Sequence, residues 1–137
     1  MRTILSIIIL VTLASSCGKE HELDNFKNQV SGKWEKAELI CGECPNPRTI
    51  YPQGNGSIIV LFSDGTFERR LHDSITFKGK YFLNKSDECG SRSDIALSTN
   101  EYSNSIPGFV NIESGRLHIS TPYCIADGAT TIYRRIE

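Results

Sequence analysis

Hydrophobic and polar residues alternate along much of this chain, most clearly in the stretch ITFKGKYFL at residues 75–83. Ile75, Phe77, Tyr81 and Leu83 fall on one side of that alternation, and a period of two residues marks a strand with one buried face. The same pattern, bounded by turn residues, predicts eight short strands, and no helical pattern interrupts them. They lie at 32–41, 57–63, 66–71, 75–83, 93–99, 108–112, 116–120 and 128–136. The sequence therefore predicts an all-β domain, either an antiparallel barrel or a sandwich.

Two pairs of these predicted strands are joined by short turns. Asp64-Gly65 separates the strands at 57–63 and 66–71, and Asp-Gly supplies the positive φ angles of a tight hairpin turn. A second hairpin, through the turn ESG at 113–115, joins the strands at 108–112 and 116–120. Short turns make consecutive strands antiparallel neighbours, and closing the sheet into a barrel leaves no exposed strand edge.

The first 16 residues have a different pattern. Arg2 precedes an apolar run from Ile4 to Leu13, and the small residues ASS follow. The run is shorter than the roughly 20 apolar residues that a membrane-spanning helix needs. A cation, an apolar run and small residues in this order predict a secretory signal peptide at 1–16.

The net charge argues against binding to nucleic acid or to an anionic lipid surface. Residues 1–16 contain a single charged side chain, Arg2, so the rest of the chain has 14 basic and 16 acidic side chains and a net charge of −2. This is not the basic surface that nucleic acid or anionic lipid would attract. The length suits one domain with a core of its own, and we expect a monomer.

The segment LASSC at residues 13–17 resembles the lipobox of bacterial lipoproteins. In that family the cysteine, here Cys17, becomes the first mature residue and carries the lipid. The next residues, GKEHELD, are similar to the polar tethers of Bacteroidetes-type lipoproteins. The resemblance implies an acyl anchor on Cys17 at the cell outer membrane, a tether over 17–30 with at most one helical turn in LDNFKNQV, and a folded domain over 31–137.

Four further segments resemble the small lipocalin-like domains of the same lipoproteins: SGKWEKAEL, FSDGTF, FKGKYFL and RLHISTPYCIADGATTIYRRI. The resemblance covers about residues 31–136 and implies an eight-stranded up-and-down barrel closed between its first and last strands. Gly32-Lys33-Trp34 also matches the Gly-x-Trp of lipocalins, whose Trp plugs the closed end under an Arg from the last strand. The resemblance gives Arg134 or Arg135 that role, by a cation–π contact.

Four cysteines follow Cys17, and two of them form the motif CGEC at 41–44. In an exported chain, Cys41, Cys44, Cys89 and Cys124 predict two structural disulfides. A thiol-redox pair would need a helix directly after the first cysteine, and the prolines in CGECPNP exclude one. A four-cysteine zinc site is also disfavoured, because the last two cysteines stand alone in the sequence.

The pairing of these cysteines is left open by the strand count. If the strands alternate in direction, Cys41, Cys44 and Cys124 lie at the open end, and Cys124 pairs with one of the other two. The count puts Cys89 at the opposite end. The alternative is that Cys89 pairs with Cys124 and that CGEC closes on itself.

One charged residue stands on a side of a strand that is expected to be buried. In TFERRL the alternation places Arg69 on the same face as Phe67, and Tyr81 shares the inward face of the strand at 75–83. A buried cation is costly unless it is paired, so Arg69 is either the counter-ion of a ligand, with Phe67 and Tyr81 beside it, or the partner of an acid such as Glu38.

No motif implies catalysis, a cofactor or a metal site. We therefore expect a non-enzymatic barrel that binds a small, partly apolar ligand at its mouth. The alternative is an interaction module of the cell envelope, with a solid core and recognition by the loops at 42–56 and 100–107. A thiol-redox protein that uses CGEC is a more distant alternative.

Overall fold

The computed structural model describes residues 17–85, 95–99, 108–121 and 128–137. The predicted signal peptide at 1–16, the loop at 100–107, Cys89 and Cys124 lie outside these residues. The described elements are α2 (Cys17–Val30), β1 (Gly32–Cys41), β2 (Arg48–Ile50), β3 (Ser57–Leu61), β4 (Thr66–Leu71), β5 (Ser74–Lys85), β6 (Ile95–Thr99), β7 (Gly108–Glu113), β8 (Arg116–Ser120) and β9 (Ala129–Arg135).

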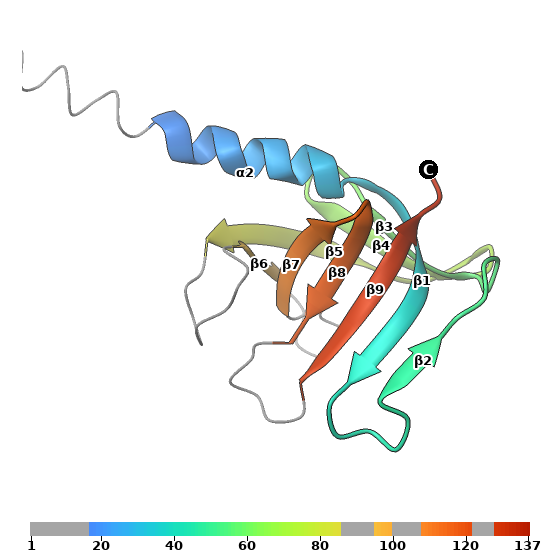
Figure 1. Ribbon diagram of the computed structural model, residues 1–137. Coiled ribbons are helices and arrows are strands. Elements are labelled where there is room, and N and C mark those ends of the chain that lie inside the picture. Colours follow the sequence, from blue (N-terminus) through green and yellow to red (C-terminus); the bar gives the residue numbers. More distant parts are fainter. Residues whose placement is uncertain (1–16, 86–94, 100–107, 122–127) are drawn as a thin grey trace, which may run out of the picture.

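Eight of the strands form a closed antiparallel barrel, which confirms the predicted fold class (Figure 1). The order β1-β3-β4-β5-β6-β7-β8-β9 follows the chain, and β1 pairs with β9 to close the wall. That closing pairing runs from Trp34, opposite Arg135, to Cys41, opposite Ala129, with a register shift between Lys36 and Glu38. The topology is therefore up-and-down, as the resemblance to lipocalin-like domains implied.

The ninth strand, β2, lies outside the barrel sequence. Only residues 32–35 of β1 pair with β3, while residues 38–40 pair with β2 on that side. The second half of β1 thus leaves β3 and takes a short strand from the following loop as its neighbour. The segment at 42–56 had been predicted to be entirely loop, and this prediction is wrong for Arg48–Ile50.

A 14-residue helix, α2, precedes the barrel where the sequence predicted a polar tether with at most one helical turn. The helix lies across one end of the barrel in Figure 1. Its last residue, Val30, is fully buried, and Phe26 packs against the core. The reason is the spacing of Leu23, Phe26 and Val30, which places three apolar side chains on one helical face.

The barrel has two distinct ends. The closed end contacts α2 and contains the start of β1, the turn at 62–65 and the C-terminal residues after β9. The open end contains the end of β1, the turn at 72–73 between β4 and β5, and the start of β9. Among the described residues, no helix is long and apolar enough to cross a membrane.

One apolar cluster fills the barrel interior beneath α2. Among the described residues, the large side chains that are almost completely buried come from α2 and from six strands, so they join most of the wall. They are Val30, Trp34, Leu61, Phe67, Leu97, Val110 and Leu117. Burying each such side chain contributes about 1.5–3 kcal/mol, which makes this cluster a main source of stability.

Candidate binding site at the open end of the barrel

Trp34 closes the barrel beneath α2. Its side chain is 1% exposed, and its indole N–H donates to the Val30 carbonyl at 2.7 Å. The Arg135 guanidinium lies 4.5 Å from the centre of the Trp34 ring system. Of the two arginines that the sequence offered for this contact, Arg135 makes it, whereas Arg134 points to a different cluster.

Two of the three residues predicted to contact a ligand belong to the core. Phe67 is 1% exposed and packs against Phe77, with ring centroids 5.5 Å apart. Tyr81 is 2% exposed, and its hydroxyl donates to the Phe62 carbonyl at 2.7 Å, in the turn at the closed end. Both side chains therefore fill the barrel wall and interior near α2.

Arg69, the third of these residues, lies nearer the open end and points inward. Its neighbours across the strand pairs are Ile59 on β3 and Phe77 on β5, and both belong to or pack against the core. Side chains directly opposite each other share a face of a sheet, so Arg69 lies on the inner face with them. It is half-buried.

The charge of Arg69 acts on Tyr133 of β9. Tyr133 packs against the core and faces the fully buried Leu117 across the β8–β9 pair. Burial raises the pKa of Tyr133, and the positive charge of Arg69 opposes that rise. Because β1 and β3 lie between β9 and β4 in the wall, the charge of Arg69 acts on the Tyr133 phenol from another side of the barrel.

Exposed aliphatic side chains lie on the strands near this end of the barrel. Ile75 is one of them, and it pairs with Arg70 across a register shift, so it lies on the outer face and not on the inner face that the sequence pattern predicted. Leu71 ends β4 with 54% of its surface exposed, and Ile75 begins β5 with 43% exposed. Ile40 and Ile50, on β1 and β2, are exposed to 41% and 71%. The open end therefore combines an inward cation, a buried phenol and an apolar rim.

The motif CGEC closes on itself at this end. Cys41 and Cys44 form a disulfide, with their Cα atoms 5.5 Å apart. The Cys41 N–H also donates to the Pro47 carbonyl at 2.9 Å, so the loop turns tightly back towards β2. Of the alternatives left open by the sequence, the self-closed motif is the one found, and a bond from Cys124 to either cysteine is wrong. A Cys89–Cys124 bond stays a prediction.

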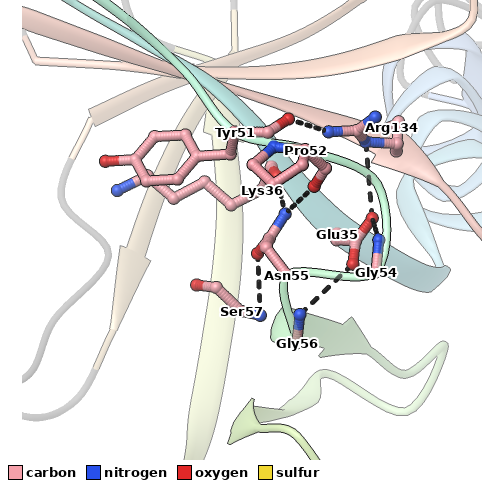
Figure 2. A network of polar contacts seen from close by, with 9 residues as sticks. All are labelled: Glu35, Lys36, Tyr51, Pro52, Gly54, Asn55, Gly56, Ser57 and Arg134. Atoms are coloured by element: carbon pink, nitrogen blue, oxygen red, sulfur yellow. Dashed lines mark hydrogen bonds and ion pairs between the residues drawn. The ribbon is translucent and has the colours of Figure 1, made fainter.

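A second buried cluster, on the outside of the barrel, was missed by sequence reasoning. Glu35 is 3% exposed, and its carboxylate accepts the N–H groups of Gly54 at 3.1 Å and Gly56 at 3.3 Å (Figure 2). Arg134 Nε lies 3.4 Å from the same carboxylate, as an ion pair without hydrogen-bond geometry. The charge of Glu35 is thus compensated by one guanidinium and two backbone donors.

The loop at 51–56 supplies the rest of this cluster. Arg134 donates to the Tyr51 carbonyl, and the Asn55 amide donates to the Lys36 carbonyl at 2.8 Å (Figure 2). Lys36 Nζ lies 4.5 Å from the centre of the Tyr51 ring. These contacts fasten the loop to β1 at the point where β3 leaves it. The cluster therefore holds the loop against the barrel wall through contacts among its own residues.

Glu38, which the sequence offered as a partner for Arg69, is used elsewhere. Its Oε1 atom lies 2.5 Å from Arg48 Nε on β2. The geometry is that of an ion pair, because the N–H does not point at that oxygen. The pair holds β2 beside β1.

The outer face of β4 and β5 has an exposed charge cluster. Glu68 Oε2 lies 2.6 Å from Arg70, and Glu68 Oε1 lies 3.0 Å from Lys78. Hydrogen bonds from Arg70 and Lys78 lower the pKa of Glu68. Arg70 therefore points outward beside the inward Arg69. Substituting either arginine by glutamine removes the same charge, so Arg70→Gln can serve as the control for Arg69→Gln.

In the part of the chain that the structure describes, no three His, Cys, Asp or Glu side chains are grouped as a metal site would require. Comparisons of the chain with protein-family models, with curated proteins and with solved structures found no significant match. The proposed function therefore rests on the positions of side chains in the barrel.

Proposed function

We propose that this protein is a non-enzymatic binding barrel, anchored by a lipid on Cys17 at the outer membrane. Its open end takes a small, partly apolar molecule with an anionic group. Arg69 provides the cation, Tyr133 provides a hydroxyl, and the aliphatic rim around Leu71 and Ile75 provides the apolar surface. The position of Arg69 inside the barrel is the single observation that carries the proposal.

The energetic argument starts from the cost of that position. Placing a cation between Ile59 and Phe77 removes much of its hydration, a penalty of several kcal/mol that only close partners offset. Binding sites typically combine apolar walls with a few convergent polar groups. A ligand carboxylate at Arg69 would make charge-assisted hydrogen bonds with the guanidinium, while its apolar part covers the rim.

The packing of the closed half limits the size of the ligand. Trp34, Phe67 and Tyr81 are each at most 2% exposed and occupy the interior near α2. A ligand would therefore enter only the outer half of the barrel, and part of it would contact the rim. This favours a small molecule over a long lipid buried along the whole axis.

A second function, a protein-interaction module, is supported by the rim itself. Leu71, Ile75, Ile40 and Ile50 are all more than 40% exposed at the open end. Exposed aliphatic side chains at one end of a monomer are typical of a contact surface for another protein. The two functions differ in their dependence on Arg69, because a partner that covers the rim does not need an inward cation.

Calorimetric titration with dodecanoate, as a probe for an apolar anion, separates these functions. The probe is titrated into the Cys17→Ser protein without its signal peptide, and then into the same protein with Arg69→Gln or Arg70→Gln. We expect Arg69→Gln to weaken binding at least tenfold, about 1.4 kcal/mol, because it removes the counter-ion. Arg70→Gln keeps the net charge equal to that of Arg69→Gln and should leave the affinity unchanged within about twofold.

The neutral probe dodecanol completes the design. Arg69→Gln should not weaken its binding, since an alcohol has no charge to pair. Equal losses for both probes would mean that Arg69 only shapes the pocket. No binding of either probe, together with loss of an envelope partner in a Leu71→Ser/Ile75→Ser variant, would favour the protein-interaction function.

The anchor is tested separately. Because the lipid on Cys17 is the proposed membrane attachment, Cys17→Ser should move the protein from the membrane fraction to the soluble fraction of its host. Intact mass of the wild-type chain should show the added acyl mass. A Cys17→Ser protein that stays with the membrane after high-salt washing would contradict the proposed anchor.

A further inference from the structure

Helix α2 begins at the proposed lipidation site and ends at Val30, which is buried against the closed end of the barrel. Three of its last four carbonyls, those of Lys27, Gln29 and Val30, accept hydrogen bonds from Ser31 or from side chains of the closed end. The Val30 carbonyl accepts from the Trp34 indole, and the Gln29 and Ser31 carbonyls accept from the Arg135 guanidinium. Helix ends leave such carbonyls without partners inside the helix, so these bonds fix the end of α2 on the barrel.

Contacts continue along the helix towards its start. Phe26 packs against the core, and Glu22 lies 2.6 Å from Lys85 at the end of β5. Leu23 lines a groove of about 370 Å³ together with Phe82 and neighbouring residues of β5. The helix is therefore held against the closed end from residue 22 to residue 30, and only its first turn precedes these contacts.

This geometry changes what an anchor at Cys17 does. Fourteen residues in a helix span about 21 Å, whereas the same number fully extended would reach up to about 50 Å. A helix fixed at residues 22–30 also cannot swing freely about its end. A lipid at residue 17 would thus hold the closed end of the barrel near the bilayer.

The closed end also has two exposed aromatic side chains. Phe62, in the turn between β3 and β4, is 38% exposed, and Phe82, beside α2, is 51% exposed. Aromatic residues are enriched at the interface between lipid and water. Among the residues that the structure describes, the other large exposed hydrophobic side chains are aliphatic, and they belong to β1, β2, β4 and β5.

The charges around this end are mixed. The cations Lys27 and Lys85 are interleaved with Glu22, Asp24 and Asp64. Electrostatic attraction to anionic lipid would therefore contribute little, and a membrane contact here would depend on the anchor and the aromatic side chains.

We propose that α2 is a rigid strut that sets the closed end of the barrel, with Phe62 and Phe82, against the lipid surface and points the open end away from it. This proposal rests on the lipid anchor at Cys17. It implies that the binding site at the open end faces the aqueous phase, where a soluble ligand or partner is accessible.

The test uses the mature lipidated protein in nanodiscs of phosphatidylethanolamine and phosphatidylglycerol that contain a lipid with a nitroxide headgroup. Nitroxide broadens amide signals steeply with decreasing distance. The Phe62 and Phe82 amides should lose at least twice as much intensity as the Leu71 and Ile75 amides. Equal loss at both ends, or greater loss at Leu71 and Ile75, would overturn the proposal.

A pair of variants isolates the role of the helix. His21→Pro breaks the first turns of α2 without touching its contacts at residues 22–30, and it should reduce the difference between the two ends by at least half. His21→Ala preserves the helix and should keep the full difference. An unchanged difference in His21→Pro would show that the strut does not orient the barrel.

Failure of the anchor is distinguishable from failure of the strut. If intact mass shows no lipid on Cys17, both proposals fall. If the lipid is present but both ends are broadened equally, only the strut is wrong. A soluble Cys17→Ser protein added to the same nanodiscs should show no broadening, and broadening there would contradict the dependence on the lipid.

Discussion

The two ends of this barrel differ in what occupies them. At the closed end, Trp34 is stacked between the cap of α2 and Arg135, and its one polar atom is bonded to Val30. Towards the open end, Arg69 lies on the inner face, its charge acts on the buried Tyr133, and exposed aliphatic side chains lie nearby. One end is filled by close packing of apolar and aromatic side chains, while the other holds a half-buried cation on its inner face. This difference is what the proposed binding function uses.

The largest expected effect comes from breaking the closed end. Trp34→Ala should lower the free energy of unfolding by about 3–5 kcal/mol, because it removes a fully buried aromatic side chain and the contacts of Val30 and Arg135. Urea melts monitored by far-UV circular dichroism would measure the loss. A loss below about 1 kcal/mol would mean that the closed end is not the stable part of the domain.

The outer cluster at Glu35 should come next. Glu35→Gln leaves Arg134 without its countercharge and weakens two backbone hydrogen bonds, which should cost about 1.5–3 kcal/mol. Glu68→Gln removes a carboxylate at the surface of the barrel wall with two cationic partners and is the matched comparison, with a much smaller loss than that of Glu35→Gln expected. Equal losses from both variants would contradict the burial of the Glu35 cluster.

The pH dependence of Glu68 gives a further check on that control. Its pKa is lowered in the folded protein by the hydrogen bonds from Arg70 and Lys78. Its contribution to stability is therefore present above the ordinary glutamate pKa and is lost as the pH falls through the lowered value. Proton titration of the Glu68 side chain by NMR should show the lowered pKa, and Arg70→Gln should bring it back towards the ordinary value.

Removing the disulfide at the open end should have a smaller effect on stability. Cys41 and Cys44 enclose only two residues, and closing so short a loop restricts the unfolded chain by about 1–2 kcal/mol. Cys41→Ser/Cys44→Ser should lose that amount in urea melts and retain binding. A loss above about 4 kcal/mol, or thiols that react readily in the native wild type, would contradict a purely structural, self-closed CGEC.

The strands were predictable because local alternation determines them. The bounds of β4 and β8 agree with the sequence pattern, whereas the closure between β1 and β9 was expected only from the resemblance to lipocalin-like domains. The helix α2 carried a detectable signal as well, in the spacing of Leu23, Phe26 and Val30. The charged residues between them made that segment resemble a tether.

The Glu35 cluster could not be predicted from local pattern. A glutamate beside an inward Trp34 has the position of an ordinary outward polar residue, and only the folded loop at 51–56 buries it. The strand β2 is three residues long, too short for alternation to be seen. Both features depend on contacts between segments that are distant in sequence.

The smallest expected effect is a change in the pKa of Tyr133, and it depends on the charge of Arg69 in the barrel interior. Burial raises the pKa of Tyr133 and the charge of Arg69 lowers it, so Arg69→Gln should raise it further, and Arg70→Gln should not. Ultraviolet titration of the phenolate would measure the shift. Because the folded pKa is raised, the contribution of Tyr133 to stability is present below the ordinary tyrosine pKa and is lost as the pH rises through the folded value. An unchanged pKa of Tyr133 in Arg69→Gln would contradict an electrostatic interaction between Arg69 and Tyr133.

The central claim, that the open end binds and the closed end does not, is tested most directly by mapping amide shifts during titration with dodecanoate. The protein is the ¹⁵N-labelled Cys17→Ser chain without its signal peptide. We predict that the amides of Arg69, Leu71 and Ile75 shift with the probe, while the Trp34 indole signal stays in place. Shifts at Trp34 and along α2, with none at Arg69, would contradict the account.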